Sequence, residues 1–180
     1  MNPDPAAHLI LADDTQKYLY IHDDVHQQDS GSHWINPHSK SFVMDHSHPF
    51  SIIGIKFRVG ALYSLNLTSS QFHLNTVIGT RLINELIQAK SFSLSNLLDQ
   101  SVEDPEQVGH MLDDLLLPRI FKSSEDKYKT LVNRTAALIM GNPISQIGEI
   151  LHCSQRTIER SFLRVTGLTL TKLDGTAKGG

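Results

Sequence analysis

The pattern of apolar residues changes along the chain. Short runs of β-branched and aromatic residues come first, and apolar residues at helical spacing follow. The early runs lie at 18–21, 34–35, 41–44 and 50–57, and we predict a strand at each. The last run, FSIIGIKF, has the strongest strand composition. From about residue 80 the period becomes that of helices. Strands followed by helices predict an α+β fold or two separate domains.

Apolar residues share one helical face at 82–87 and again at 94–98. A longer helix is expected over 104–119, with Asp104 as its cap and Pro105 at its first position. Its apolar face suits two roles equally, packing onto the strands or forming a dimer interface through helices. This face consists of Val108, Met111, Leu112, Leu115 and Leu116. A further helix is expected over 125–140, after a linker at 121–126.

The segment 142–173 has the pattern of a helix-turn-helix. We predict a short helix over 144–151 with Asn142 as its cap and Pro143 at its first position, and Gly148 would allow the two helices to cross closely. A tight turn at 152–154 leads into a second helix over 155–165, which Ser154 caps. Gly167 ends that helix in the left-handed conformation. Its inward residues are Ile158, Phe162 and Val165.

The outer face of the second helix carries the residues that suggest DNA reading. In a helix-turn-helix this helix lies in the major groove, where arginine suits guanine and glutamine suits adenine. We therefore nominate Arg156, Glu159 and Arg160 as base readers, and Gln155 and Arg164 as phosphate or flanking contacts. Glu159 can accept from cytosine or hold a neighbouring arginine. The alternative is an ordinary helical hairpin whose charged face is solvated.

The charge is distributed unevenly along the chain. From residue 127 onward there are eight basic and three acidic residues, a net charge of +5, whereas the whole chain carries −3, so residues 1–126 carry −8. Only the C-terminal part has the sign expected at a phosphate backbone. No apolar run approaches the ~20 residues of a membrane span, and no basic region precedes the first apolar run as in a secretory signal. With Cys153 as the single cysteine, we expect a cytoplasmic protein.

The sequence resembles the AraC-type transcription regulators. The segment ISQIGEILHCSQRTIERSFLRVTGLTLTKL, residues 144–173, is similar to the first of that family's two helix-turn-helix units. The shared elements are Gly148 in the first helix, Ser154 as cap, RTIERSF at 156–162 and VTGLT at 165–169. Upstream, GIKFRVGA at 54–61 is similar to a G-(aliphatic)-x-F-x-P-G-A segment in the N-terminal domain of a subset of these regulators. The chain departs from the family pattern at Val59, where proline is usual, at His152, where glycine is frequent, and at Leu170, where proline is common.

This resemblance implies a β-rich, cupin-like sensory and dimerisation domain over 1–122, a partial helix-turn-helix domain over 123–173 and a disordered tail over 174–180. It implies double-stranded DNA, a small-molecule effector and a second copy of the chain as partners, and neither a cofactor nor an enzymatic activity. The family's module has a second helix-turn-helix that the chain does not reach. We therefore expect weak DNA binding by this chain alone. A rival interpretation is an interaction protein that does not bind DNA.

Six of the ten histidines lie between residues 22 and 48. His33, His38, His46 and His48 are a candidate metal cluster for a cupin-like enzyme, but no carboxylate lies at a clear ligand spacing. Histidines at the surface or in turns are the favoured interpretation. Cys153 is expected to be a buried structural thiol. The N-terminal aromatic residues suit a β core better than an effector pocket; they are Tyr18, Tyr20, Trp34, Phe42, Phe50 and Phe57.

Overall fold

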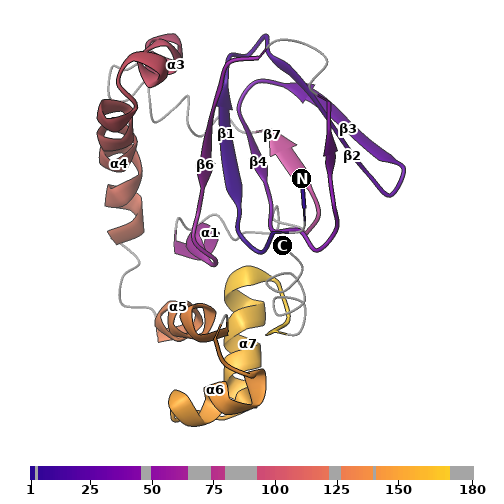
Figure 1. The fold of residues 1–180 in the computed structure, drawn as a ribbon, viewed down its shortest axis with the longest axis vertical. Helices are drawn as coiled ribbons and strands as arrows, with labels where there is room; N and C mark the ends of the chain where they lie inside the picture. The colour runs from indigo at the N-terminus through magenta and orange to yellow at the C-terminus, as the bar shows by residue number, and fades with distance from the viewer. Residues whose placement is uncertain are drawn as a thin grey trace.

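The computed structural model describes residues 1–2, 4–45, 50–64, 74–79, 93–121, 127–139 and 141–170. The first half contains two antiparallel sheets that face each other, and helices make up the second half (Figure 1). The α+β class is thereby confirmed. The four-stranded sheet has the order β6 (Ile52–Lys56), β1 (His8–Ala12), β4 (His33–Ile35), β7 (Val77–Gly79). The three-stranded sheet has the order β3 (Val25–Ser30), β2 (Lys17–His22), β5 (Val43–Met44).

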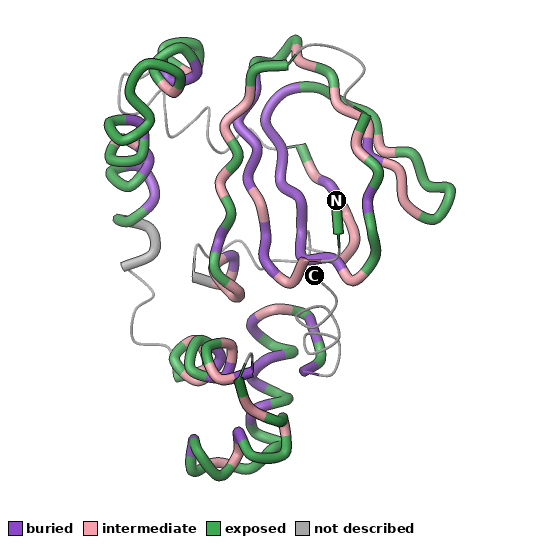
Figure 2. Tube along the Cα trace, viewed as in Figure 1, coloured by how far each residue is buried: buried purple, intermediate pink, exposed green. Residues whose placement is uncertain are grey.

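Strands β2, β4, β5 and β6 correspond to the four predicted runs, whereas β1, β3 and β7 were not predicted. Strand β1 lies between β4 and β6 and is buried on both faces, so its sequence lacks the alternation that marks a half-buried strand. Strand β3 is polar and largely exposed, and it is extended because all six of its residues pair with β2. Figure 2 shows the contrast between buried β1 and exposed β3.

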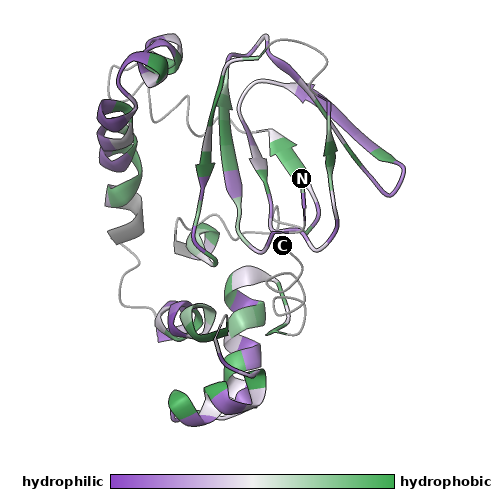
Figure 3. Cartoon of the chain, in the orientation of Figure 1, coloured by the Kyte–Doolittle hydropathy of each residue, from purple (hydrophilic) through white to green (hydrophobic). Residues whose placement is uncertain are grey.

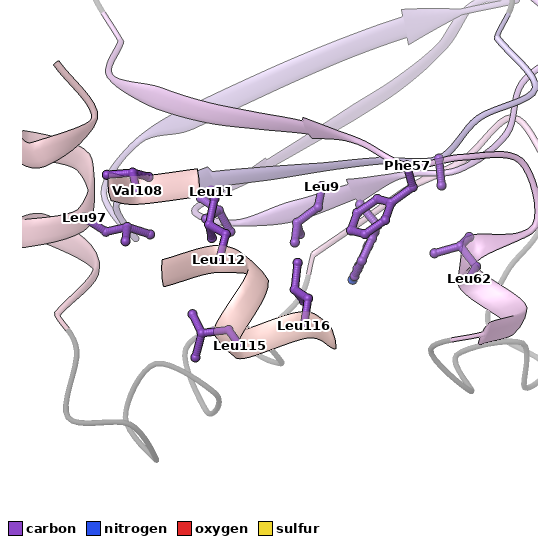
Figure 4. Close-up of a cluster of buried hydrophobic side chains, with 11 residues drawn as sticks. Leu9, Leu11, Phe57, Leu62, Leu97, Val108, Leu112, Leu115 and Leu116 are labelled. Atoms are coloured by element: carbon purple, nitrogen blue, oxygen red, sulfur yellow. The ribbon is translucent and has the colours of Figure 1, made fainter. Parts of the chain in front are cut away.

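The side chains of β1 point alternately into two cores. Ile10 lies between the sheets with Tyr20, Ile35, Phe42 and Val77. Leu9 and Leu11 point the other way, toward helices α3 (Leu94–Glu103) and α4 (Pro105–Phe121). Figure 4 shows Leu112 and Leu116 of α4 against these two leucines. The apolar face predicted for this helix therefore packs onto the strands. Asp104 caps α4 as expected, accepting from the Gln107 N–H at 3.0 Å.

A second core joins helices α5 (Lys127–Ile139), α6 (Ile144–Ile150) and α7 (Gln155–Thr166). Val132 and Ile139 of α5 pack with Ile158 and Phe162 of α7, and Figure 3 shows the resulting alternation of hydrophobic and hydrophilic residues along α7. Residues from the first half close this core. Val59 packs against it, as does Tyr63 from the short helix α1 (Ala61–Ser64).

Gly60 lies close to the helical core, next to Val165 of α7. Its φ is +83°, and a Cβ added there would lie 2.8 Å from Cγ1 of Val165. Only glycine combines that backbone conformation with that closeness. The helix predicted at 82–87, most of the 121–126 linker and the predicted tail lie outside the described residues. Within the described ranges, no helix combines the length and apolar character needed to cross a bilayer.

Candidate nucleic-acid interface

The turn between α6 and α7 is closed by a backbone hydrogen bond against Gly148. The Cys153 N–H donates to the Gly148 carbonyl at 3.0 Å, and a Cβ at Gly148 would lie 2.9 Å from the Cys153 carbonyl oxygen. The small residue makes room for the turn, and a Cβ there would also lie 3.7 Å from the backbone nitrogen of Gln155, the first residue of α7. His152 has φ +53°, in the left-handed region that favours glycine. The half-buried Cys153 packs against the helical core.

The start of α6 differs from the prediction. Helix α6 begins at Ile144, with Pro143 as the capping residue and no side-chain cap. The Asn142 amide instead donates to the Leu138 carbonyl at 2.9 Å, at the end of α5. The expected cap on α6 is thus wrong: Pro143 occupies the capping position, and the Asn142 side chain is directed toward the unpaired carbonyls that end the preceding helix.

Helix α7 begins and ends where the sequence predicts, within one residue. The Ser154 hydroxyl accepts from the Thr157 N–H at 3.2 Å, which satisfies one of the unpaired donors of the first turn. Gly167, with φ +71°, ends the helix, and its N–H donates to the Leu163 carbonyl. Ile158, Phe162 and Val165 are buried as predicted. These contacts fix which face of α7 points outward.

The outward face presents every nominated residue. Gln155, Arg156, Glu159, Arg160 and Arg164 are all exposed. The Gln155 amide donates to a Glu159 carboxylate oxygen at 2.9 Å, so Glu159 is held by glutamine rather than by an arginine. Arg156, Arg160 and Arg164 follow one another at intervals of four residues, a spacing that places them along one side of the helix.

Arg164 stands apart from the other two arginines because it contacts α5. Its guanidinium lies 4.5 Å from the centre of the Tyr128 ring, and the Lys127 ammonium lies 5.2 Å from the same centre. The sequence pattern nominated Arg164 as a phosphate or flanking contact, but it did not nominate Lys127 or Tyr128 for any contact. No local pattern links residues 127–128 to residue 164, because only the packing of α5 on α7 brings them together.

A cavity of about 270 Å³ lies between the two sheets. Tyr18, Tyr20, His33 and Phe50 are among the side chains that line it. The aromatic residues of this half therefore divide. Trp34, Phe42 and Phe57 are buried in the cores as favoured by the sequence, while Tyr18 and Phe50 face the cavity. Burial raises the pKa of Tyr18 to about 12, so its hydroxyl stays protonated at neutral pH.

His33 and His38 are buried, which corrects their assignment to the surface or to turns. His33 lies on β4, an inner strand, and its Nδ1 donates to the Gly31 carbonyl while its Nε2 accepts from the Tyr20 hydroxyl, both at 2.9 Å. Burial lowers the pKa of each imidazole, and this favours the neutral form. The His33 imidazole is therefore a buried polar group whose two nitrogens both have hydrogen-bond partners.

The described residues contain no cluster of side chains that could hold a metal ion. None of the histidine, cysteine, aspartate and glutamate side chains in those ranges gather in a group of three or more that could hold an ion. His46 and His48, which belonged to the predicted cluster, lie outside the described residues. We found no protein-family model, no curated protein and no solved structure that matches the chain.

Proposed function

We propose that the chain is a sequence-specific DNA-binding transcription regulator of the AraC type, in which α6 and α7 form a helix-turn-helix. One observation carries the proposal: α7 is anchored through Ile158, Phe162 and Val165, while the opposite face exposes polar side chains over its first two turns. A helix held in this way can enter the major groove, which is about 12 Å wide, without losing its packing.

The outward side chains have the chemistry for reading base edges. Arg156 and Arg160 offer planar donor pairs that match the two acceptors of guanine, and each such contact is worth roughly 1–3 kcal/mol of discrimination. The Gln155–Glu159 hydrogen bond restrains both side chains before DNA arrives, which reduces the entropy lost on binding. Ser154 caps the start of α7, and this keeps the first turn of the helix ordered.

The test is selection of preferred sites from random-sequence duplexes by the purified chain at low salt. Because we expect weak binding by this chain alone, the selection uses a protein concentration high enough to populate weak complexes. Under these conditions we expect an enriched consensus, and we expect Arg156→Ala to relax the preference at one base pair while leaving the rest of the consensus in place. Arg160→Ala should relax a neighbouring position. Both residues are exposed, so neither substitution should disturb the fold.

Lys40→Ala is the matched control, since Lys40 is an exposed basic residue in the first half of the chain and does not line the cavity between the sheets. It removes one positive charge, as the arginine substitutions do, but not from α7. The regulator proposal is overturned if the wild-type chain enriches no consensus, or if both arginine variants enrich the same consensus as the control with equal strength.

We also propose that the two-sheet half is a cupin-like sensory domain whose cavity takes a small effector. The support is the mixed lining of apolar and hydrogen-bonding side chains between the sheets, which is typical of small-molecule sites. A thermal-shift screen of small metabolites would identify a ligand. Tyr18→Ala should abolish that shift, because Tyr18 contributes both a ring and a hydroxyl to the lining. A ligand whose shift survives this substitution binds elsewhere.

Two exposed apolar residues favour a second candidate function, an interaction protein that uses its helices to bind another copy. Leu163 of α7 is 54% exposed and Ile150 of α6 is 42% exposed. Sedimentation velocity of the wild type and of Leu163→Glu separates the candidates. Self-association that Leu163→Glu abolishes, in a chain without DNA affinity, would favour this function over the first.

A further inference from the structure

We propose that Lys127 and Tyr128 of α5 join Arg164 of α7 in a cluster that binds the phosphate backbone of duplex DNA beside the reading helix. This inference rests on the regulator function proposed above and adds a contact from a second helix. Neither Lys127 nor Tyr128 belongs to the predicted reading face, and their role follows from the packing of α5 against α7.

The cluster is organised around one aromatic ring. The Tyr128 side chain is half-buried and packs against the helical core. The Arg164 guanidinium lies 4.5 Å from the ring centre and the Lys127 ammonium lies 5.2 Å from it. Both distances are within the range of about 6 Å in which a cation is attracted to an aromatic face.

The ring reduces the entropic penalty that long basic side chains pay when they bind. A free lysine or arginine samples many rotamers, and an anion that immobilises it must oppose that loss. Here each cation already lies against the Tyr128 ring, and this contact restrains its side chain. Arginine supplies a fork that matches two phosphate oxygens, and lysine supplies a point charge.

The position of the cluster suits the backbone rather than the bases. Arg164 is eight residues beyond Arg156 and lies along the same side of α7, about 12 Å further along the helix axis. The major groove is about 12 Å wide. When the first turns of a helix enter the groove, its later turns therefore lie near the phosphates that line the groove. Lys127 and Tyr128 extend the basic surface from this end of α7 onto α5.

Salt dependence of binding tests the cluster, because each phosphate contact adds about 0.9 to the slope of log affinity against log salt concentration. Fluorescence anisotropy would follow a labelled random-sequence duplex with the full chain, with Lys127→Gln, with Tyr128→Leu and with the control Lys40→Gln. Between about 50 and 200 mM salt, wild-type affinity should fall roughly 3.5-fold more than that of Lys127→Gln. Lys127→Arg should restore the wild-type slope.

Tyr128→Leu keeps an apolar side chain in the core and both cations, so it should lower affinity at every salt concentration while leaving the slope unchanged. This separates restraint by the ring from loss of charge. Circular dichroism of each variant would show whether the helices remain folded.

The outcomes distinguish this inference from the function on which it rests. If the wild type binds duplex DNA and Lys127→Gln has the same slope as wild type and Lys40→Gln, the cluster is overturned and the regulator function stands. If no duplex binds to the wild type at low salt, both are overturned. If Lys127→Gln lowers the slope but Arg156→Ala and Arg160→Ala leave site selection unchanged, the cluster is upheld and the reading role of α7 fails.

Discussion

Adding one methyl group at Gly148 perturbs the turn on which the orientation of α7 depends. In Gly148→Ala the new Cβ would meet the Cys153 carbonyl oxygen at 2.9 Å. That distance is roughly half an ångström short of ordinary van der Waals contact. The atom in the way belongs to the backbone of a turn whose N–H is already bonded to the Gly148 carbonyl, so no side chain can rotate aside.

Two effects of opposite sign set the change in the free energy of unfolding of Gly148→Ala. Alanine in place of glycine inside a helix stabilises by roughly 0.5–1 kcal/mol, because the unfolded chain loses freedom. Forcing an extra carbon into a packed site costs typically 1–3 kcal/mol. Because the backbone must move, we expect the second effect to dominate and Gly148→Ala to lower the free energy of unfolding by about 1–2 kcal/mol.

Gly109→Ala is the matched control, since Gly109 lies inside α4 and a Cβ there would have no atom within 4 Å. Only the helical gain remains, so this variant should be more stable than wild type by roughly 0.5–1 kcal/mol. Urea unfolding, followed by circular dichroism at a helix-sensitive wavelength, would compare the three proteins. If Gly148→Ala is stabilised to the same extent as Gly109→Ala, then the turn does not lie against Gly148 as described.

Three further predictions concern other strained or buried positions. His152→Gly should raise the free energy of unfolding by about 1 kcal/mol in urea titrations, because His152 has φ +53°; an unchanged midpoint would argue against the left-handed turn. Burial lowers the pKa of His33 and His38 below 6.5, so the unfolded chain takes up protons first as the pH falls through that value. The free energy of unfolding should therefore decrease below about pH 6.5, by at most about 1.4 kcal/mol per pH unit for each histidine, and His33→Gln should flatten the profile measured by urea unfolding between pH 7.5 and 5. Gly60→Ala should destabilise the wild type more than it destabilises Val165→Ala, since the added Cβ would lie 2.8 Å from Val165; a double-mutant cycle with no coupling would contradict this contact.

Local chemistry explains why much of the helical half could be predicted from the sequence. A serine cap, an apolar residue every three or four positions and a glycine stop act within one or two turns of helix, so Ser154, Phe162 and Gly167 have the roles that their spacing indicates. The outward face of α7 follows from the same period. The strand within 50–57 could also be predicted from the sequence, because its composition alone favours an extended chain.

The remaining features depend on contacts between residues far apart in the chain, and only the tertiary structure decided them. Strand β3 is polar and is extended because it pairs with β2. His33 is buried because β4 is an inner strand and Tyr20 supplies its hydrogen bond. Likewise, Tyr128 meets Arg164, and Gly60 meets Val165, through packing that joins separate helices or the two halves of the chain. Local sequence thus determined which face of α7 points outward. Tertiary packing decided what lies beside that face, because a contact at long sequence separation leaves no periodic signal in either segment.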